Sequence, residues 1–117
     1  PEAPRLYDVA IEMDGDRWSD RVGFRTLQTR GREILLNGRP RFLKGIAMHE
    51  ERLGVEGGRI RTEAEARALL TEVKALGCDF VRLAHYPHGE ATLRLADEMG
   101  LIVWAEIPVY WEDVAYA

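Results

Sequence analysis

Residues 62–106 decide the fold of this chain and read TEAEARALLTEVKALGCDFVRLAHYPHGEATLRLADEMGLIVWAE. Thr62 and Glu65 form a capping-box pattern, which is typical of a helix N-terminus. The apolar residues that follow recur at helical spacing: Ala66, Leu69, Leu70, Val73 and Leu76. Gly77 stands where a left-handed residue commonly ends a helix. The pattern predicts an amphipathic helix between Thr62 and Gly77 with that apolar face buried.

The rest of this stretch alternates between strands and a helix. Residues 80–84 and 101–105 are short and mostly apolar, which predicts two buried strands. A second helix is expected from about Gly89 through Met99, ending at Gly100, with Leu93, Ala96 and Met99 pointing inward. Residues 43–48 are read as a buried strand before the first helix. The order strand, helix, strand, helix, strand predicts an α/β fold with parallel strands joined by right-handed crossovers.

The chain before residue 43 has the pattern of antiparallel β structure. Alternation of Tyr7, Val9 and Ile11 with polar neighbours predicts a strand with one buried face. Turn-forming residues 14–16 follow, and residues 21–27 are read as a second strand. Asn37-Gly38 lies between two apolar runs and predicts a hairpin with a type I′ turn. The Gly-rich residues 54–58 are expected to form a mobile loop.

Composition narrows the class of protein. The chain has 117 residues, 46% apolar and 31% charged, with a formal net charge of −4, which fits a globular domain and disfavours nucleic acid as a partner. No apolar run is long enough to cross a membrane and no secretory signal is recognised, so no membrane association is expected and the compartment is left open. The single Cys78 excludes an intramolecular disulfide and is read as a small buried hydrophobe. The length is well below the roughly 250 residues of a closed eight-fold barrel.

Polar side chains follow all three predicted parallel strands. These are His49 with Glu50, His85 with Tyr86, and Glu106. Reacting groups of parallel α/β proteins gather at the carboxyl ends of the strands, so these residues are candidates for one site. Arg82 joins them, because a guanidinium within an apolar strand is costly unless a carboxylate pairs with it.

Structural interpretations of the same residues stay open. Arg82 could close an internal salt bridge without a chemical role, and a lone His49 is more often a loop or core residue. Two histidines and a carboxylate could also hold zinc or iron, although the HxH and HxxxH spacings are missing. His88 is expected to face solvent. Aromatic residues could stack on a sugar or simply pack: Trp104, Tyr110 and Trp111.

Four motifs together resemble glycoside hydrolase family 2, the family of β-galactosidases, β-glucuronidases and β-mannosidases. They are GFRT at residues 23–26, LNGRP at 36–40, LKGIAMHE at 43–50 and VRLAHYP at 81–87, in the order of the family. The resemblance covers nearly the whole chain. It implies that residues 1–30 are the C-terminal strands of an immunoglobulin-like β-sandwich. Residues 31–117 would be the N-terminal part of a catalytic (β/α)₈ TIM barrel, with its first three βα units.

The resemblance also implies roles for individual residues. His49 and His85 are similar to the histidines that contact sugar hydroxyls, and Arg82 is similar to the arginine that orients the nucleophilic carboxylate. Glu50, Tyr86 and Glu106 would support these side chains from behind. Both catalytic glutamates of the family lie on later barrel strands, so none is expected within this chain. No metal or other cofactor is carried over, because residues 107–111 lack the acidic and histidine ligands of the magnesium-dependent members.

The implied function is that of a fragment of a retaining, exo-acting β-glycosidase that hydrolyses terminal β-linked sugars. A β-galactosidase is favoured and a β-glucuronidase comes next, while the isolated piece is expected to be inactive. Two alternatives stay open. One is a non-catalytic carbohydrate-binding or self-assembling module, which would form a homo-oligomer through exposed strand edges. The other is a metal-dependent barrel hydrolase.

Overall fold

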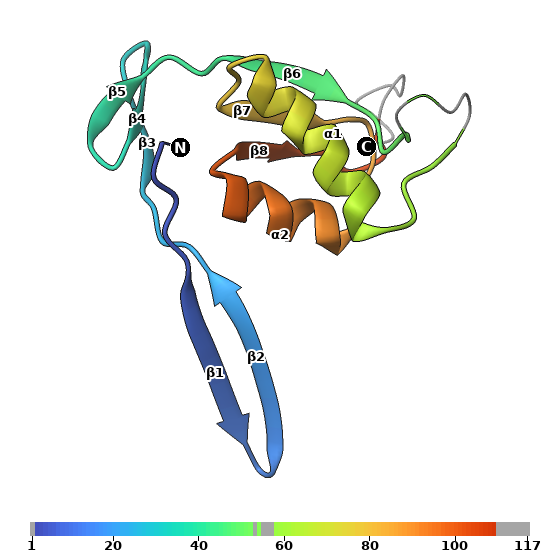
Figure 1. The fold of residues 1–117 in the computed structure, drawn as a ribbon. Coiled ribbons are helices and arrows are strands. Elements are labelled where there is room, and N and C mark those ends of the chain that lie inside the picture. Colours follow the sequence, from blue (N-terminus) through green and yellow to red (C-terminus); the bar gives the residue numbers. More distant parts are fainter. Residues whose placement is uncertain (1, 53, 55–57, 110–117) are drawn as a thin grey trace.

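The computed structural model describes residues 2–52, 54 and 58–109, and Figure 1 shows their arrangement. Eight strands and two helices form within these residues. Their bounds are β1 Tyr7–Met13, β2 Asp16–Val22, β3 Leu27–Arg30, β4 Glu33–Leu36, β5 Arg39–Arg41, β6 Gly45–Met48, α1 Glu63–Ala75, β7 Phe80–Leu83, α2 Glu90–Met99 and β8 Ile102–Ala105. Neither helix is long and apolar enough to cross a membrane.

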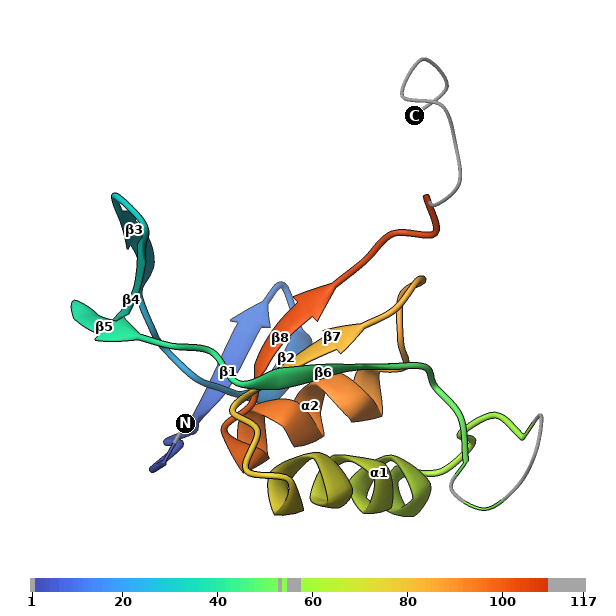
Figure 2. The ribbon, with the colours of Figure 1, turned by 90° about the horizontal axis from the view of Figure 1, so that it is seen from above.

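A parallel sheet in the order β6-β7-β8 forms the centre of the α/β unit. The two helices α1 and α2 connect its strands and cover the same face, as Figure 2 shows from above. The predicted order of strands and helices is therefore confirmed. Three βα units were expected, and the described residues hold two of them followed by the strand that would open a third.

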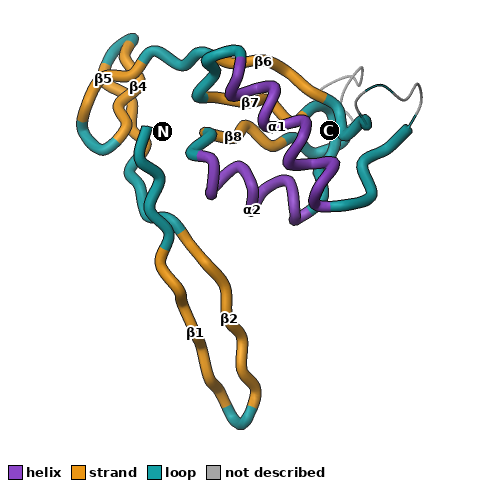
Figure 3. Tube along the Cα trace, viewed as in Figure 1, coloured by secondary structure: helices purple, strands orange, loops and turns teal. Residues whose placement is uncertain are grey.

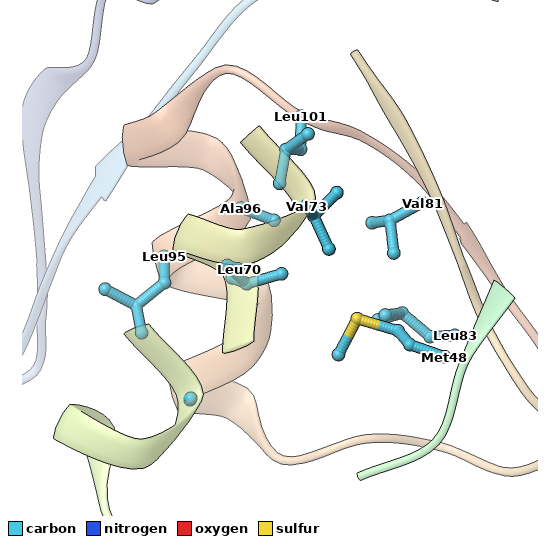
Figure 4. Close-up of a cluster of buried hydrophobic side chains, with 9 residues drawn as sticks. Met48, Leu70, Val73, Val81, Leu83, Leu95, Ala96 and Leu101 are labelled. Carbon is cyan, nitrogen blue, oxygen red and sulfur yellow. The ribbon is translucent and has the colours of Figure 1, made fainter. Parts of the chain in front are cut away.

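The hydrophobic core lies between this sheet and the two helices (Figure 4). Its buried members come from all five elements or the residue next to them: Met48, Ala66, Leu70, Val73, Val81, Leu83, Leu95, Ala96 and Leu101. The part-buried Cys78 packs against this cluster, as expected of a small hydrophobe. The capping box at Thr62 is present, with Thr62 Oγ1 accepting from the backbone N–H of Glu65. Gly77 and Gly100 both have positive φ and follow helix ends, as the sequence predicts.

Two expected core residues are exposed instead. Leu76 was predicted to face inward, but α1 ends at Ala75 and the side chain of Leu76, its C-cap residue, is 70% exposed. Leu93 was also predicted to face inward and is 38% exposed. Ala96 is buried and Met99 packs part-buried against the core, as predicted, and the other buried residues of α2 are Thr92 and Leu95.

The second face of the parallel sheet carries no helix in the described part of the chain. Register places Ala47, Arg82 and Trp104 side by side across the three strands on this face. Residues 101–105 were expected to form a fully buried strand, which is wrong for Trp104, whose side chain is 59% exposed. Side chains alternate between the faces of a strand, so a sheet covered on one side buries one residue in two.

An antiparallel ribbon of β1 and β2 projects from the α/β unit (Figure 3). The predicted strand at residues 7–11 is confirmed, but its expected buried face is not, since Tyr7 and Ile11 are 49% and 56% exposed. The second strand was expected at residues 21–27 and instead spans Asp16–Val22. The reason is the tightness of the turn: Asp14 and Gly15 both have positive φ, and Met13 pairs directly with Asp16.

A small antiparallel sheet in the order β3-β4-β5 leads into the α/β unit. The predicted hairpin at Asn37-Gly38 is confirmed, with φ values of 51° and 75° at these two residues and direct pairing of Leu36 with Arg39. Asn37 also binds the chain before β3, because its Oδ1 accepts from the backbone N–H of Thr26 at 2.9 Å. Most of the predicted Gly-rich loop, residues 55–57, lies outside the described residues.

Candidate functional site

The carboxyl ends of the three parallel strands lie at one edge of the sheet, and each is followed by a polar residue. His49 follows β6, His85 comes two residues after β7, and Glu106 follows β8. The His49 and His85 rings are in edge-to-face contact with centroids 5.4 Å apart. Nδ1 of His85 lies 3.0 Å from Oε2 of Glu106. The structure thus brings together side chains that follow three separate strands, because His49 contacts His85 and His85 contacts Glu106.

Arg82 completes this arrangement from within β7. Its Nε donates to Oε1 of Glu106 at 2.6 Å, and its Nη2 lies 3.3 Å from Nδ1 of His85. Strand register explains why Arg82 reaches Glu106. Arg82 on β7 pairs with Trp104 on β8, and Glu106 comes two residues after Trp104, so its side chain lies on the same side of the sheet. The Glu106 carboxylate therefore restrains both the Arg82 guanidinium and the His85 imidazole. The side chains of Arg82 and His85 are 41% and 36% exposed.

The surroundings of the Glu106 carboxyl group favour its ionised form. Its pKa is lowered below the usual value, first by the hydrogen bond from Arg82 and then by the hydrogen bond from His85, while desolvation opposes both. The side chain is 16% exposed. A charge-assisted hydrogen bond of this length restrains the Arg82 side chain as well as neutralising it in part.

An open cleft of about 510 Å³ lies beside Arg82, His85 and Glu106, and His49 is not among the residues that line it. It is lined by Arg82, His85, Trp104, Ala105, Glu106, Ile107 and Val109. A cleft with one exposed indole and a few hydrogen-bonding side chains can bind a ligand that has both an apolar face and hydroxyl groups. The other two aromatic candidates, Tyr110 and Trp111, lie outside the described residues.

Glu50 and Tyr86 lie beside the histidines and contact each other. The backbone N–H of Glu50 donates to the hydroxyl oxygen of Tyr86 at 3.1 Å. The Tyr86 ring lies 5.9 Å from the ring of His49. The Glu50 carboxylate is directed elsewhere, since its Oε1 accepts from the backbone N–H of Gly89 at 2.5 Å. Neither residue lines the cleft beside Arg82.

His88 was expected to face solvent and is instead 8% exposed. Its Nε2 lies 3.1 Å from the carbonyl oxygen of Ala84, and its ring stacks on Tyr86 with centroids 5.1 Å apart. The turn between β7 and α2 folds back on itself and covers His88, which a linear pattern does not reveal. The peptide bond between Ala84 and His85 at the start of this turn is cis.

Metal ligation was one of the open alternatives. Across residues 2–52, 54 and 58–109, no group of three or more His, Cys, Asp or Glu side chains is arranged to hold a metal ion. The oxygen atoms of Glu106 are instead occupied by Arg82 and His85.

Sequence reasoning missed two residues, one at the opposite end of the sheet from the site and one beside Tyr86. Asp79 is 6% exposed and precedes β7, where its carboxylate accepts from Arg41 at 3.0 Å and from the backbone N–H of Lys44 at 2.8 Å. It joins the β4–β5 hairpin to the base of the sheet, and the signal available was an acidic residue directly before an apolar strand. Arg59 places its guanidinium over the Tyr86 ring, 5.3 Å from the centroid. No motif marked Arg59.

Comparison with known proteins assigns the family. The family model described as "Glycosyl hydrolases family 2, TIM barrel domain" matches residues 27–114. A β-galactosidase from Arthrobacter sp. strain B7 is 38% identical over 90% of this chain and 10% of its own length. A β-glucuronidase from Streptococcus agalactiae is 34% identical over 88% of this chain and 18% of its own.

Solved structures agree with these relatives. The crystal structure of a family 2 β-galacturonidase from Eisenbergiella tayi bound to galacturonate has a TM-score of 0.82 and 39% identity, and the match covers 91% of this chain and 19% of that one. The chain thus spans between 10% and 19% of the lengths of these relatives. The matched region, the parallel strands and the shared sequence agree that the chain belongs to glycoside hydrolase family 2 and contains part of its TIM barrel domain.

Proposed function

We propose that this chain is part of a retaining, exo-acting β-glycosidase that removes terminal β-linked sugars, with a β-galactoside as the first candidate substrate and a β-glucuronide as the second. The main support for the proposal is a series of contacts at the carboxyl edge of the sheet. His49 contacts His85, and Glu106 binds both His85 and Arg82. Relatives named β-galactosidase and β-glucuronidase support it. The structure named a β-galacturonidase adds a third β-linked sugar to test.

In this proposal, His49 and His85 bind hydroxyl groups of the sugar. Imidazole nitrogens both donate and accept hydrogen bonds, which suits hydroxyl recognition. Arg82, fixed by Glu106, orients the carboxylate that acts as nucleophile. The Arg82 guanidinium donates to Glu106 through Nε, and 41% of the side chain is exposed. Its other N–H groups therefore include donors for a second carboxylate. Glu50 and Tyr86 support the histidines without touching the sugar.

The proposal also holds that these 117 residues alone do not hydrolyse glycosides. A retaining glycosidase needs two carboxyl groups about 5 Å apart, one as nucleophile and one as acid/base. Two carboxylates at this edge of the sheet are already engaged: Glu50 by Gly89, and Glu106 by Arg82 and His85. In this assignment the catalytic pair belongs to later barrel strands of a longer polypeptide.

The domain organisation is proposed accordingly. Residues 1–30 are assigned to the end of an immunoglobulin-like sandwich and residues 31–117 to the start of the barrel. The ribbon β1–β2, with its exposed Ile11 and Trp18, supports the first assignment, because strands with apolar side chains usually have a second layer.

Nitrophenyl glycosides test the activity. The 117-residue chain should release no nitrophenol above background from the β-galactoside, β-glucuronide or β-galacturonide. The encoding reading frame, read onward, should show an Asn-Glu pair after a fourth strand pattern. The longer product should then hydrolyse one of these substrates, with the β-anomer of the sugar appearing first by NMR. Rapid turnover by the short chain, or a first product of inverted configuration, would refute the proposal.

A second candidate function rests on the edges of the parallel sheet. In the order β6-β7-β8, the outer strands have no further strand partner among the described residues. Exposed edges can pair with a second copy, so a self-assembling module is the alternative. Light scattering separates the two: a clean monomer argues against assembly, whereas a concentration-dependent dimer supports it.

A further inference from the structure

We propose that Glu50 is a positioning residue, which caps helix α2 from the neighbouring strand end and thereby ties together the two loops that carry His49 and Tyr86. The capping contact stands on geometry alone. The statement that the restrained rings bind sugar rests on the proposed function.

The N-terminus of α2 has no cap of its own. Its N-cap residue is Gly89, which has no side chain, and no local side chain accepts a hydrogen bond there. The first backbone N–H groups of a helix need acceptors, and a carboxylate is a favoured one because it also meets the positive end of the helix dipole. Glu50 supplies this carboxylate from 39 residues earlier in the chain, with Oε1 2.5 Å from the Gly89 nitrogen.

Glu50 is held in place on both sides. Its side chain is 12% exposed, and the second carboxylate oxygen, Oε2, lies 3.6 Å from Nη2 of Arg59. Arg59 in turn lies over the Tyr86 ring. The backbone N–H of Glu50 donates to the Tyr86 hydroxyl. Main chain and side chain of this one residue therefore both contact the loop between β7 and α2.

Glycine at position 89 makes room for this contact. A Cβ atom there would lie 3.0 Å from Oε1 of Glu50, closer than ordinary van der Waals contact. The backbone itself does not require glycine, since φ is −61° and ψ is 147°, values that suit a serine N-cap. The missing side chain thus leaves the space beside the helix N-terminus that the distant carboxylate occupies, where it accepts from the backbone N–H of Gly89 itself.

The hydrogen bond between Glu50 and Gly89 has a geometric consequence for the site. His49 precedes Glu50, and its ring contacts both His85 and Tyr86, which belong to the opposite loop. Restraining Glu50 against Gly89 therefore restrains the separation of the two loops and the contact between the rings. A local cap would stabilise α2 equally well, but it would not join the loops. This difference separates a positioning role from a merely structural one.

The experiment uses four variants of the 117-residue chain without sugar. E50A removes the carboxylate, and E50A/G89S adds in the space that opens a local serine cap, whose hydroxyl can accept from the backbone N–H of Ala91 or Thr92. E50Q keeps an oxygen acceptor without the charge, and E51A is the matched control because Glu51 is an exposed neighbour. Thermal unfolding and amide hydrogen exchange at residue 89 and in the first turn of α2 report on the cap. The NMR signals of the His49, His85 and Tyr86 rings report on the tie.

We expect E50A to lower Tm by about 3–6 °C, to speed first-turn exchange by about 5- to 10-fold and to shift all three ring signals. E50A/G89S should regain Tm and first-turn protection, while the amide of residue 89 still exchanges fast and the ring signals stay shifted. E50Q should keep the ring signals of the unaltered chain, and E51A should change neither readout. Recovery of the rings in E50A/G89S would overturn the positioning role, and unchanged exchange in E50A would overturn the cap. Because no sugar enters the experiment, neither result depends on the proposed glycosidase activity.

Discussion

Nε of Arg82 lies 2.6 Å from Oε1 of Glu106, and the second oxygen of the same carboxylate lies 3.0 Å from Nδ1 of His85. One carboxylate at the end of β8 therefore organises two side chains that belong to β7 and its following turn. Removing Glu106 would leave the Arg82 cation without its shortest contact.

The pH dependence of stability should report on Glu106. Its pKa is lowered in the folded chain, mainly by Arg82, so its contribution to stability is complete above the usual value near 4.5 and is lost as pH falls through the lowered pKa. Urea unfolding at pH 6 and pH 3 should show a smaller loss of stability for E106Q than for the unaltered chain. E72Q, on the exposed face of α1, should behave like the unaltered chain. Equal pH dependence in all three would contradict the prediction.

Asp79 should be important for stability although it lies outside the site. The D79N variant weakens the ion pair with Arg41, whose side chain is 29% exposed, and alters the acceptor for Lys44. We expect a loss of about 2–4 kcal/mol in the free energy of unfolding, measured in urea. D97N changes an exposed residue near the end of α2 and should cost far less. Similar losses for both variants would show that the anchor is unimportant.

The turn at Gly38 should resist substitution for backbone reasons. Its φ is +75°, and a Cβ there would meet nothing within 4 Å, so G38A adds backbone strain without a clash. We expect a cost of about 1–2 kcal/mol in unfolding free energy. The control is G23A, where φ is not positive and the new Cβ would make an ordinary 3.4 Å contact with Leu6. If G38A were no more costly than G23A, the turn would not depend on glycine.

Leu70 in α1 and Leu76, the C-cap residue that follows this helix, should differ in their tolerance of truncation to alanine. Leu70 is 0% exposed in the core, whereas Leu76 is 70% exposed at the end of α1. L70A should lose about 2–5 kcal/mol of unfolding free energy, because it leaves a cavity. L76A should change the unfolding free energy by less than about 0.5 kcal/mol, as is usual for surface positions. A large effect of L76A would contradict its placement at the surface.

Local signals predicted much of the fold. The capping box at Thr62 and the glycines after both helices marked helix ends, and Asn37-Gly38 marked a hairpin. These features depend on a few neighbouring residues, which is why sequence alone reveals them. The errors arose where tertiary packing decides. Leu93 and Trp104 are apolar residues in regular elements, yet the burial of each depends on which face is covered.

In the candidate site, too, some features could be predicted from the sequence and others could not. Strand order predicted that His49, His85 and Glu106 follow strands of one sheet, since the ends of parallel strands share an edge. The burial of His88 and the contact of Glu50 with Gly89 were not predictable, because both depend on the path of the turn between β7 and α2. Sequence patterns indicate which residues follow a strand, but not how the next loop folds back.

The helix-free face of the parallel sheet, which carries Arg82 and Trp104, also affects the electrostatic interaction between Arg82 and Glu106. Water reaches this face, and at a high dielectric constant the attraction between two unit charges is weak. Any segment that closes over it displaces that water and lowers the local dielectric constant, so the same Arg82–Glu106 contact then interacts several times more strongly. The ion pair would become more rigid as the enclosure is completed, without a change in its own geometry.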